Sequence, residues 1–233
     1  MRIAQLGRPR VSFSSATNVV WHGNSLVAGV GSTGGQTLPV QVAALAPMAG
    51  SGASTVNGGV NGQDWGGMQS TAASVVDAAW VSGKINVLLL WETTNSVFGY
   101  LKTASQTQTL IADYVAARKA VHPWTVLHLT TIPRAGGGNV TDQTARDNLN
   151  AVMASVDTYV KANYRGMGID AVCDVRQAGS PFAFANYLPA TFDAIGSLWS
   201  EGTGAQIHLS NAGYAVVAGY VAEAMRRLPR PRG

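Results

Sequence analysis

Cysteine is almost absent from this sequence: Cys173 is the only one among 233 residues. A single cysteine cannot form an intrachain disulfide, and it excludes a zinc site built from several cysteines. Because it lies in the mostly apolar segment 168–173, we interpret it as a small buried hydrophobic residue. His22, His122 and His128 do not share ligand spacing with carboxylates, so we expect no metal and no other cofactor.

Charge is scarce too, at 12% of the residues against 46% hydrophobic residues. This composition is typical of a globular protein with a large buried fraction. The formal net charge is +4, but the basic residues are scattered except in the tail 226–232. A nucleic-acid-binding surface needs clustered lysines and arginines with aromatic residues between them, so we expect no nucleic-acid partner.

Long hydrophobic runs are also missing. No apolar run reaches the ~18 residues of a membrane-spanning helix, and residues 1–8 lack the apolar core of a signal peptide. We therefore expect a soluble protein without a membrane span. The length suits one domain over residues 1–233, with an N-terminal extension at 1–15 and a basic tail at 228–233.

Short apolar segments alternate with longer amphipathic ones along the chain. The apolar segments predict strands at 18–21, 54–57, 85–91, 125–132 and 169–175. The amphipathic segments predict helices at 36–46, 68–82, 103–121, 141–163 and 210–227. Strands that are apolar on both faces indicate a parallel sheet covered on both sides. We predict an α/β protein: a three-layer α/β/α sandwich with a central, mostly parallel five-stranded sheet.

Chemically active residue types follow the predicted strands. GNS (23–25), NGGVNGQD (57–64) and ETTNS (92–96) follow the first three strands, and QIHLSNAGY (206–214) leads into the last helix. Ligands bind parallel sheets at the carboxyl ends of the strands. A serine needs a neighbouring base such as histidine to become a nucleophile, and the oxyanion that it forms needs amide donors. The set therefore indicates acyl transfer.

Taken in order, these segments resemble the four sequence blocks of the SGNH or GDSL hydrolases, whose fold is flavodoxin-like. GNSL (23–26) is similar to the first block with Asn in place of Asp, and 57–63 to the second. WETTNS (91–96) and HLSNAGY (208–214) are similar to the third and fourth blocks. The resemblance extends over roughly residues 16–226.

The resemblance implies a role for each matched residue. Ser25 is implied as the nucleophile and His208 as the general base. The backbone N–H groups of Ser25 and Gly62, with the side chain of Asn95, are implied as the oxyanion hole. Each residue also has a purely structural interpretation. Ser25 suits a helix N-cap, His208 could simply precede a helix capped by Ser210 or Asn211, and Asn95 suits a turn. Within its glycine-rich loop, the position of Gly62 could instead be taken by Gly59.

One position departs from the family pattern. The family's acid stands three residues before the histidine, where this chain has Ala205. Three alternatives stay open: Glu201 supplies the carboxylate, a backbone carbonyl orients the ring of His208, or catalysis is lost and the domain only binds.

The segment GVGSTG (29–34) fits the glycine pattern of dinucleotide-binding loops. Such a site also needs an acidic residue about 20 residues further on, and 49–57 contains none. A nucleotide-binding domain is therefore the weakest hypothesis.

The preferred hypothesis is a serine esterase that forms an acyl-enzyme on Ser25 and acts on short acyl groups, of the acetyl type. An acetylated carbohydrate is a substrate suggested by the family resemblance, and Trp65, Phe98 and Tyr100 are candidates for lining the pocket or for the core. The alternative is a catalytically impaired glycan-binding module on the same fold. The oligomeric state and the compartment stay open.

Overall fold

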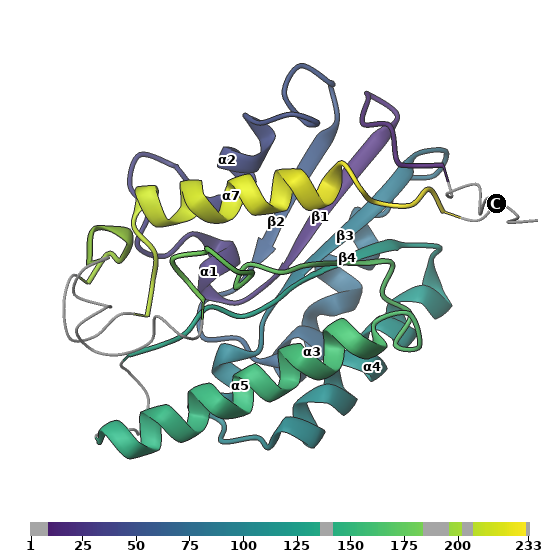
Figure 1. Ribbon diagram of the computed structural model, residues 1–233. Helices are drawn as coiled ribbons and strands as arrows, with labels where there is room; N and C mark the ends of the chain where they lie inside the picture. The colour runs from purple at the N-terminus through teal and green to yellow at the C-terminus, as the bar shows by residue number, and fades with distance from the viewer. Residues whose placement is uncertain (1–8, 136–141, 184–195, 202–206, 232–233) are drawn as a thin grey trace, which may run out of the picture.

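The computed structural model of the chain describes residues 9–135, 142–183, 196–201 and 207–231 (Figure 1). Its centre is a five-stranded sheet with the strand order β2-β1-β3-β4-β5, in which every neighbouring pair is parallel. The strands are β1 (Thr17–Gly23), β2 (Ser54–Gly59), β3 (Ile85–Trp91), β4 (Thr125–Leu129) and β5 (Ala171–Cys173). The predicted sheet is confirmed.

Helices cover both faces of this sheet, so the predicted three-layer α/β/α arrangement is also confirmed (Figure 1). One face carries α1 (Ser25–Ala28), α2 (Leu38–Ala43) and α7 (Asn211–Met225). The other face carries α3 (Trp65–Val75), α4 (Ala104–Val121) and α5 (Gln143–Asn163). Shorter turns are the 3₁₀ helices η1 (Asp77–Ala79) and η4 (Gly196–Leu198) and the π-helix η2 (Asn95–Gly99). Among the described helices, none combines the length and the hydropathy that crossing a membrane requires.

The central strand β3 divides its side chains between two cores. Leu89 and Trp91 pack with α1, α2 and α7, whereas Leu88 and Leu90 pack with α3 and α4. Successive strand residues point to opposite faces of a sheet, which explains why the segment is apolar except for Asn86. Each fully buried aliphatic side chain stabilises the fold by ~1.5–3 kcal/mol.

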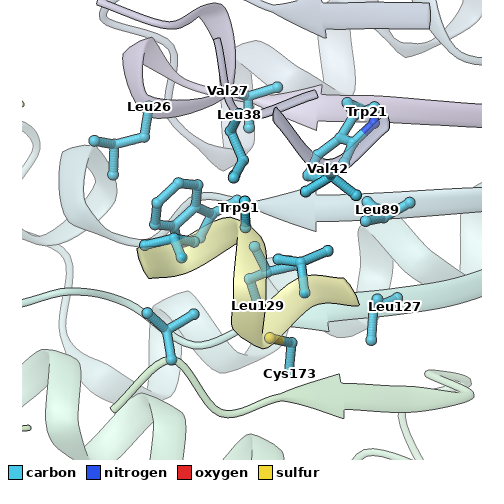
Figure 2. Packing of buried hydrophobic residues seen from close by; sticks show 14 of the residues in the cluster. Trp21, Leu26, Val27, Leu38, Val42, Leu89, Trp91, Leu127, Leu129 and Cys173 are labelled. Atoms are coloured by element: carbon cyan, nitrogen blue, oxygen red, sulfur yellow. The ribbon is translucent and has the colours of Figure 1, made fainter. Parts of the chain in front are cut away.

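Figure 2 shows the core beneath α1 and α2, where Trp91 lies close to Leu38 and Trp21 and Leu89 lie near Val42. Cys173 of β5 belongs to the same cluster, and its side chain is buried. Its predicted role as a small buried residue is confirmed. Burial also raises the pKa of its thiol, because the thiolate loses hydration there.

Two predicted helices are wrong in extent. The helix predicted at 36–46 ends at Ala43, because Pro47 lacks a backbone N–H and restricts the residue before it. The helix predicted at 68–82 begins earlier, at Trp65, because the Asp64 side chain accepts a hydrogen bond from the Gly67 N–H. This helix also ends earlier than predicted, at Val75, and the 3₁₀ helix η1 follows it.

Helix ends elsewhere lie close to the predicted ones, and side-chain caps explain them. Thr103 and Gln106 form a reciprocal capping box at the start of α4. Ser210 accepts a hydrogen bond from the Gly213 N–H at the start of α7. The helix predicted from Thr141 begins at Gln143 after an Asp142 cap; Thr141 itself lies outside the described residues.

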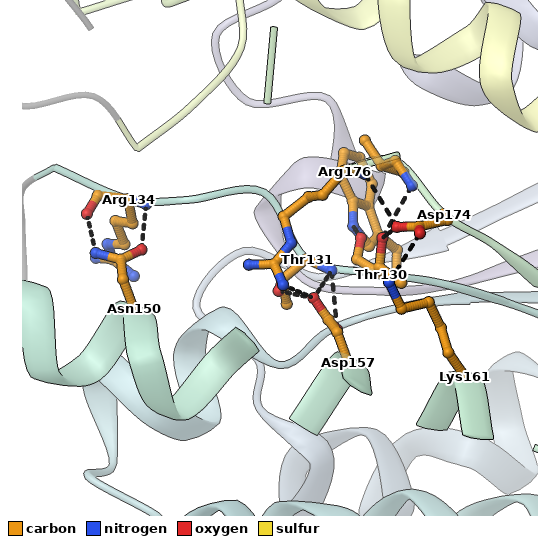
Figure 3. A network of polar contacts seen from close by, with 10 residues as sticks. Thr130, Thr131, Arg134, Asn150, Asp157, Lys161, Asp174 and Arg176 are labelled. Atoms are coloured by element: carbon orange, nitrogen blue, oxygen red, sulfur yellow. Dashed lines mark hydrogen bonds and ion pairs between the residues drawn. The ribbon is translucent and has the colours of Figure 1, made fainter. Parts of the chain in front are cut away.

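The fourth strand is shorter than predicted, since it leaves the sheet after Leu129 rather than after Ile132. Beyond that point side chains of α5 replace strand partners: the Thr131 N–H and hydroxyl donate to the buried carboxylate of Asp157 (Figure 3). Further on, Asn150 bonds both backbone groups of Arg134, at 3.0 and 2.8 Å. The chain after β4 is therefore fixed to α5, and its course is set by buried polar contacts.

Candidate active site

Ser25 lies at the carboxyl end of β1, as the first residue of the short helix α1. The side chain of Asn24 caps this helix by accepting a hydrogen bond from the Leu26 N–H at 2.9 Å. Gly59 lies against α1, where a Cβ would come within 2.1 Å of the Ala28 backbone nitrogen. The glycine therefore permits the close approach that holds Ser25 at the edge of the sheet, and Ser25 is only 4% exposed.

His208 lies in a short antiparallel pairing that precedes α7. Trp199 and Leu209 form an antiparallel bridge, and the Ser200 N–H donates to the His208 carbonyl at 3.0 Å. The Ser210 N–H donates to the Leu198 carbonyl at 2.9 Å. As a result, the backbone at Trp199 and Ser200 runs antiparallel to the backbone at His208 and Leu209.

The pairing brings Glu201 directly to the histidine. A carboxylate oxygen of Glu201 lies 2.6 Å from His208 Nδ1, and both oxygens accept from the His208 N–H at 3.1–3.2 Å. On the other side of the ring, His208 Nε2 lies 3.1 Å from Ser25 Oγ. Burial alone favours the neutral acid, but the hydrogen bonds from His208 outweigh it and lower the pKa of Glu201. Ala205, the position of the family's acid, lies outside the described residues.

The segment HLSNAGY holds the histidine and serine loops together. Tyr214 is buried, and its hydroxyl donates to the Val30 carbonyl at 2.8 Å. The Asn211 side chain accepts from the Thr33 N–H at 2.9 Å. These contacts attach the start of α7 to the chain that follows Ser25. The segment HLSNAGY therefore both carries His208 and binds the start of α7 to the loop after Ser25.

Gly31 lies where the loop after Ser25 packs against Ser200 and Leu209, on either side of the histidine pairing. It has φ +89°, and a Cβ there would come within 2.6 Å of the Leu209 carbonyl oxygen. Gly29 and Gly31, two glycines of the segment that resembled a dinucleotide-binding loop, thus serve close packing in this structure.

Asn95 follows β3 as the first residue of η2, and its surroundings link it to the loop after β2. Its Nδ2 donates to the Gln63 carbonyl at 3.0 Å. Gly62, the residue before Gln63, is exposed and has φ +78°. The Val60 N–H donates to the Gly23 carbonyl at 3.0 Å, which joins this loop to the end of β1. The loops that carry Ser25, Gly62 and Asn95 therefore meet at one edge of the sheet.

The Glu92 side chain holds the backbone at Asn95 through hydrogen bonds. One of its oxygens accepts from the Asn95 N–H at 2.7 Å, and the other accepts from the Ser96 hydroxyl at 2.9 Å. Its side chain is buried, and burial raises its pKa to about 7 because the charged form loses hydration; the hydrogen bonds from Ser96 and Asn95 only partly offset this effect.

Arg134 also reaches the site, and sequence reasoning gave it no role. Its guanidinium donates to Asn95 Oδ1 at 3.4 Å and lies 5.1 Å from the centre of the Phe98 ring. The available signal was a charged residue shortly after the fourth strand, at the edge where ligands bind. Of the proposed pocket residues, Trp65 and Phe98 are core residues, whereas Tyr100 is 59% exposed.

His22 and His128 are both buried outside this constellation. His22 Nδ1 lies 2.5 Å from the Tyr114 hydroxyl, and the His128 ring stacks on Trp65. Burial lowers the pKa of each histidine to about 4. Within the described part of the chain, no group of three or more histidine, cysteine or acidic side chains is arranged to hold a metal ion.

Known proteins match this chain through their structures. No protein-family model and no curated protein sequence matches it. A lipolytic protein of the G-D-S-L family from Veillonella parvula is 17% identical with a TM-score of 0.66, over 91% of this chain and 100% of that one. The acetylxylan esterase Axe2 from Geobacillus stearothermophilus is 12% identical with a TM-score of 0.60, over 92% of this chain and 96% of that one. The chain therefore has the fold of the SGNH or GDSL hydrolases, as its resemblance to them implied.

Replacing Gly31 by alanine tests how the two loops are held together. We expect Gly31→Ala to lower turnover at the site at least ~10-fold, because the new Cβ pushes Leu209, and with it His208, away from Ser25. Gly34→Ala is the matched control: Gly34 also has a positive φ, but a Cβ there meets no atom within 4 Å. Steady-state kinetics and melting temperatures are measured for both variants. An equal fall in turnover in Gly31→Ala and Gly34→Ala would show that the contact of Gly31 with Leu209 does not hold the site together.

The buried carboxyl of Glu92 predicts a pH-dependent stability. Its folded pKa is raised above the unfolded value of 4.5, so its stabilising contribution is present below pH 4.5 and is lost as pH rises through about 7. We expect Glu92→Gln to gain about 2–3 kcal/mol of stability relative to the wild type between pH 5 and pH 8. Urea unfolding at both pH values measures this difference. Glu223→Gln, at an exposed carboxylate, is the control and should show no such gain.

Proposed function

We propose that the protein is a carboxylic ester hydrolase that works through an acyl-enzyme on Ser25. The observation that carries the proposal is the continuous contact from Ser25 Oγ through the His208 ring to the Glu201 carboxylate, at 3.1 and 2.6 Å. A hydroxyl, an imidazole and a carboxylate in this order form the arrangement that serine hydrolases on unrelated folds use. The lipolytic and esterase neighbours named above support the same class.

In the proposed reaction, Ser25 Oγ attacks the ester carbonyl while His208 Nε2 takes the hydroxyl proton. The carbonyl oxygen becomes an oxyanion, stabilised by the N–H groups of Ser25 and Gly62 and by the Asn95 amide. When this intermediate collapses, His208 gives the proton to the leaving alcohol and the acyl group stays on Ser25. Water, deprotonated by His208, then releases the carboxylic acid and restores the serine.

Glu201 is the proposed acid of the triad. Its contact with Nδ1 holds the imidazole in the tautomer whose Nε2 can accept the serine proton, and its charge stabilises the imidazolium that forms. Its lowered pKa keeps it ionised for this purpose. The binding-module alternative drew its support from Ala205; the contact of the Glu201 carboxylate with His208 favours the hydrolase over it.

Short acyl groups are the proposed substrates, of the acetyl type. The acetylxylan esterase neighbour supports an acetylated carbohydrate as the natural ester. The exposed ring of Tyr100, which follows η2, is the proposed contact for the sugar.

Replacing the nucleophile tests the proposed reaction directly. We expect the wild type to hydrolyse p-nitrophenyl acetate faster than p-nitrophenyl octanoate, and Ser25→Ala to lower kcat by at least ~10³-fold. Ser32→Ala is the control, since Ser32 lies in the same loop but donates to the Gly29 carbonyl. Turnover by Ser25→Ala at the wild-type rate, or no turnover by the wild type, would refute the proposal.

Replacing the acid tests the triad. We expect Glu201→Gln to lower kcat by about 10²- to 10⁴-fold with little change in KM, because the neutral amide neither stabilises the imidazolium nor fixes the tautomer. The measurement is steady-state kinetics on p-nitrophenyl acetate, with circular dichroism to establish that the variant is folded. Wild-type kcat in Glu201→Gln would instead indicate a Ser–His dyad.

A further inference from the structure

We propose that Arg134 is a positioning residue of the oxyanion hole, which orients and polarises the side-chain amide of Asn95. The inference rests on the proposed ester hydrolysis, because it names how one donor of that site is prepared for its task. It assigns a role to the segment after β4.

The backbone of Arg134 is held from both sides by one buried side chain. Its N–H donates to Asn150 Oδ1 at 3.0 Å, and Asn150 Nδ2 donates to its carbonyl at 2.8 Å (Figure 3). Asn150 lies on the long helix α5 and is fully buried. The backbone at Arg134 is thus fixed to a long helix, which limits the region that its guanidinium can reach.

The guanidinium fixes which way the Asn95 amide faces. It donates to Asn95 Oδ1 at 3.4 Å, while Asn95 Nδ2 donates to the Gln63 carbonyl at 3.0 Å. A flipped amide would set its NH₂ group against the guanidinium and its oxygen against a carbonyl, so both contacts would become repulsive. An amide nitrogen carries two hydrogens, and the second remains for the oxyanion.

The guanidinium of Arg134 makes a second contact with the π-helix η2, through the ring of Phe98. The guanidinium lies 5.1 Å from the centre of the Phe98 ring, three residues after Asn95. Phe98 is buried and Arg134 is only 8% exposed. A cation that is largely removed from water interacts strongly with its neighbours, so its effect on the amide is greater than at an exposed site.

Charge explains why an arginine suits this place. A cation that donates to the amide oxygen draws electron density from the NH₂ group, and the N–H then becomes a stronger donor to a developing oxyanion. Burial lowers the pKa of Arg134, and the carboxylates of Glu201 and Glu92 oppose that lowering. The same guanidinium therefore lies within electrostatic range of the proposed acid and of the carboxyl that supports Asn95.

The test is a double-mutant cycle on the full chain with p-nitrophenyl acetate as the substrate. We expect Arg134→Gln to lower kcat about 10- to 100-fold and to leave KM within about 3-fold, since the amide acts mainly in the transition state. In an Asn95→Ala background the same change should lower kcat less than about 3-fold, because the amide through which Arg134 acts is gone. Arg134→Lys keeps the charge and should retain more kcat than Arg134→Gln.

The control is Arg118→Gln, which removes another buried guanidinium, one paired with Asp77. This variant should keep kcat within about 2-fold of the wild-type value, however much it lowers the melting temperature. Equal falls in kcat in both Asn95 backgrounds, or equal kcat in Arg134→Lys and Arg134→Gln, would overturn the inference. If Arg134→Gln does not fold, the cycle is run with Arg134→Lys, and an equal loss in both backgrounds overturns it.

Ser25→Ala separates this inference from the proposed function. If Ser25→Ala still turns over the ester, ester hydrolysis at this site is refuted. If Ser25→Ala is inactive and Arg134→Gln is as active as the wild type, only the role of Arg134 is refuted.

Discussion

The backbone pairing between Trp199 and Leu209 is the interaction on which the site depends. It places a carboxylate against one nitrogen of an imidazole and leaves the other nitrogen facing Ser25. The buried Tyr214 hydroxyl then fixes the start of α7 to the chain beyond the serine. Neither contact is strong alone, since a neutral hydrogen bond contributes about 0.5–1.5 kcal/mol net. Together they align groups that lie 183 residues apart in the sequence.

Much of the fold could be predicted because its pattern is local. Strands such as β3 are apolar on both faces, and helices such as α4 begin at capping residues that the sequence displays. The places of Ser25 and Asn95 follow from the same rule, since parallel strands end at one edge. His208 instead precedes the last helix, and its place depends on the pairing of Trp199 with Leu209. The contact between Glu201 and His208 depends instead on which backbone segments pair, and spacing along the chain does not reveal pairing. Glu201 could therefore be raised only as one of three alternatives.

Arg134 could not be assigned a role from the sequence for a related reason. Its place depends on where β4 leaves the sheet, and that point is set by Asp157 and Asn150 on a helix that comes later in the chain. Polar residues on the buried face of a helix look like exceptions to its amphipathic pattern. In the structure they are the partners that backbone groups need once strand partners end. The same dependence made the predicted strand three residues too long.

The single cysteine has a practical consequence for experiments on this chain. Cys173 lies on the edge strand β5 with its side chain in the core, and its burial disfavours the thiolate that alkylating and oxidising reagents attack. The folded protein therefore presents no competing reactive thiol among its described residues. A cysteine introduced on the exposed surface near η2 can carry a spin or fluorescent label without first removing the native one. Movements of the loop around the proposed oxyanion hole thus become measurable in an otherwise unaltered core.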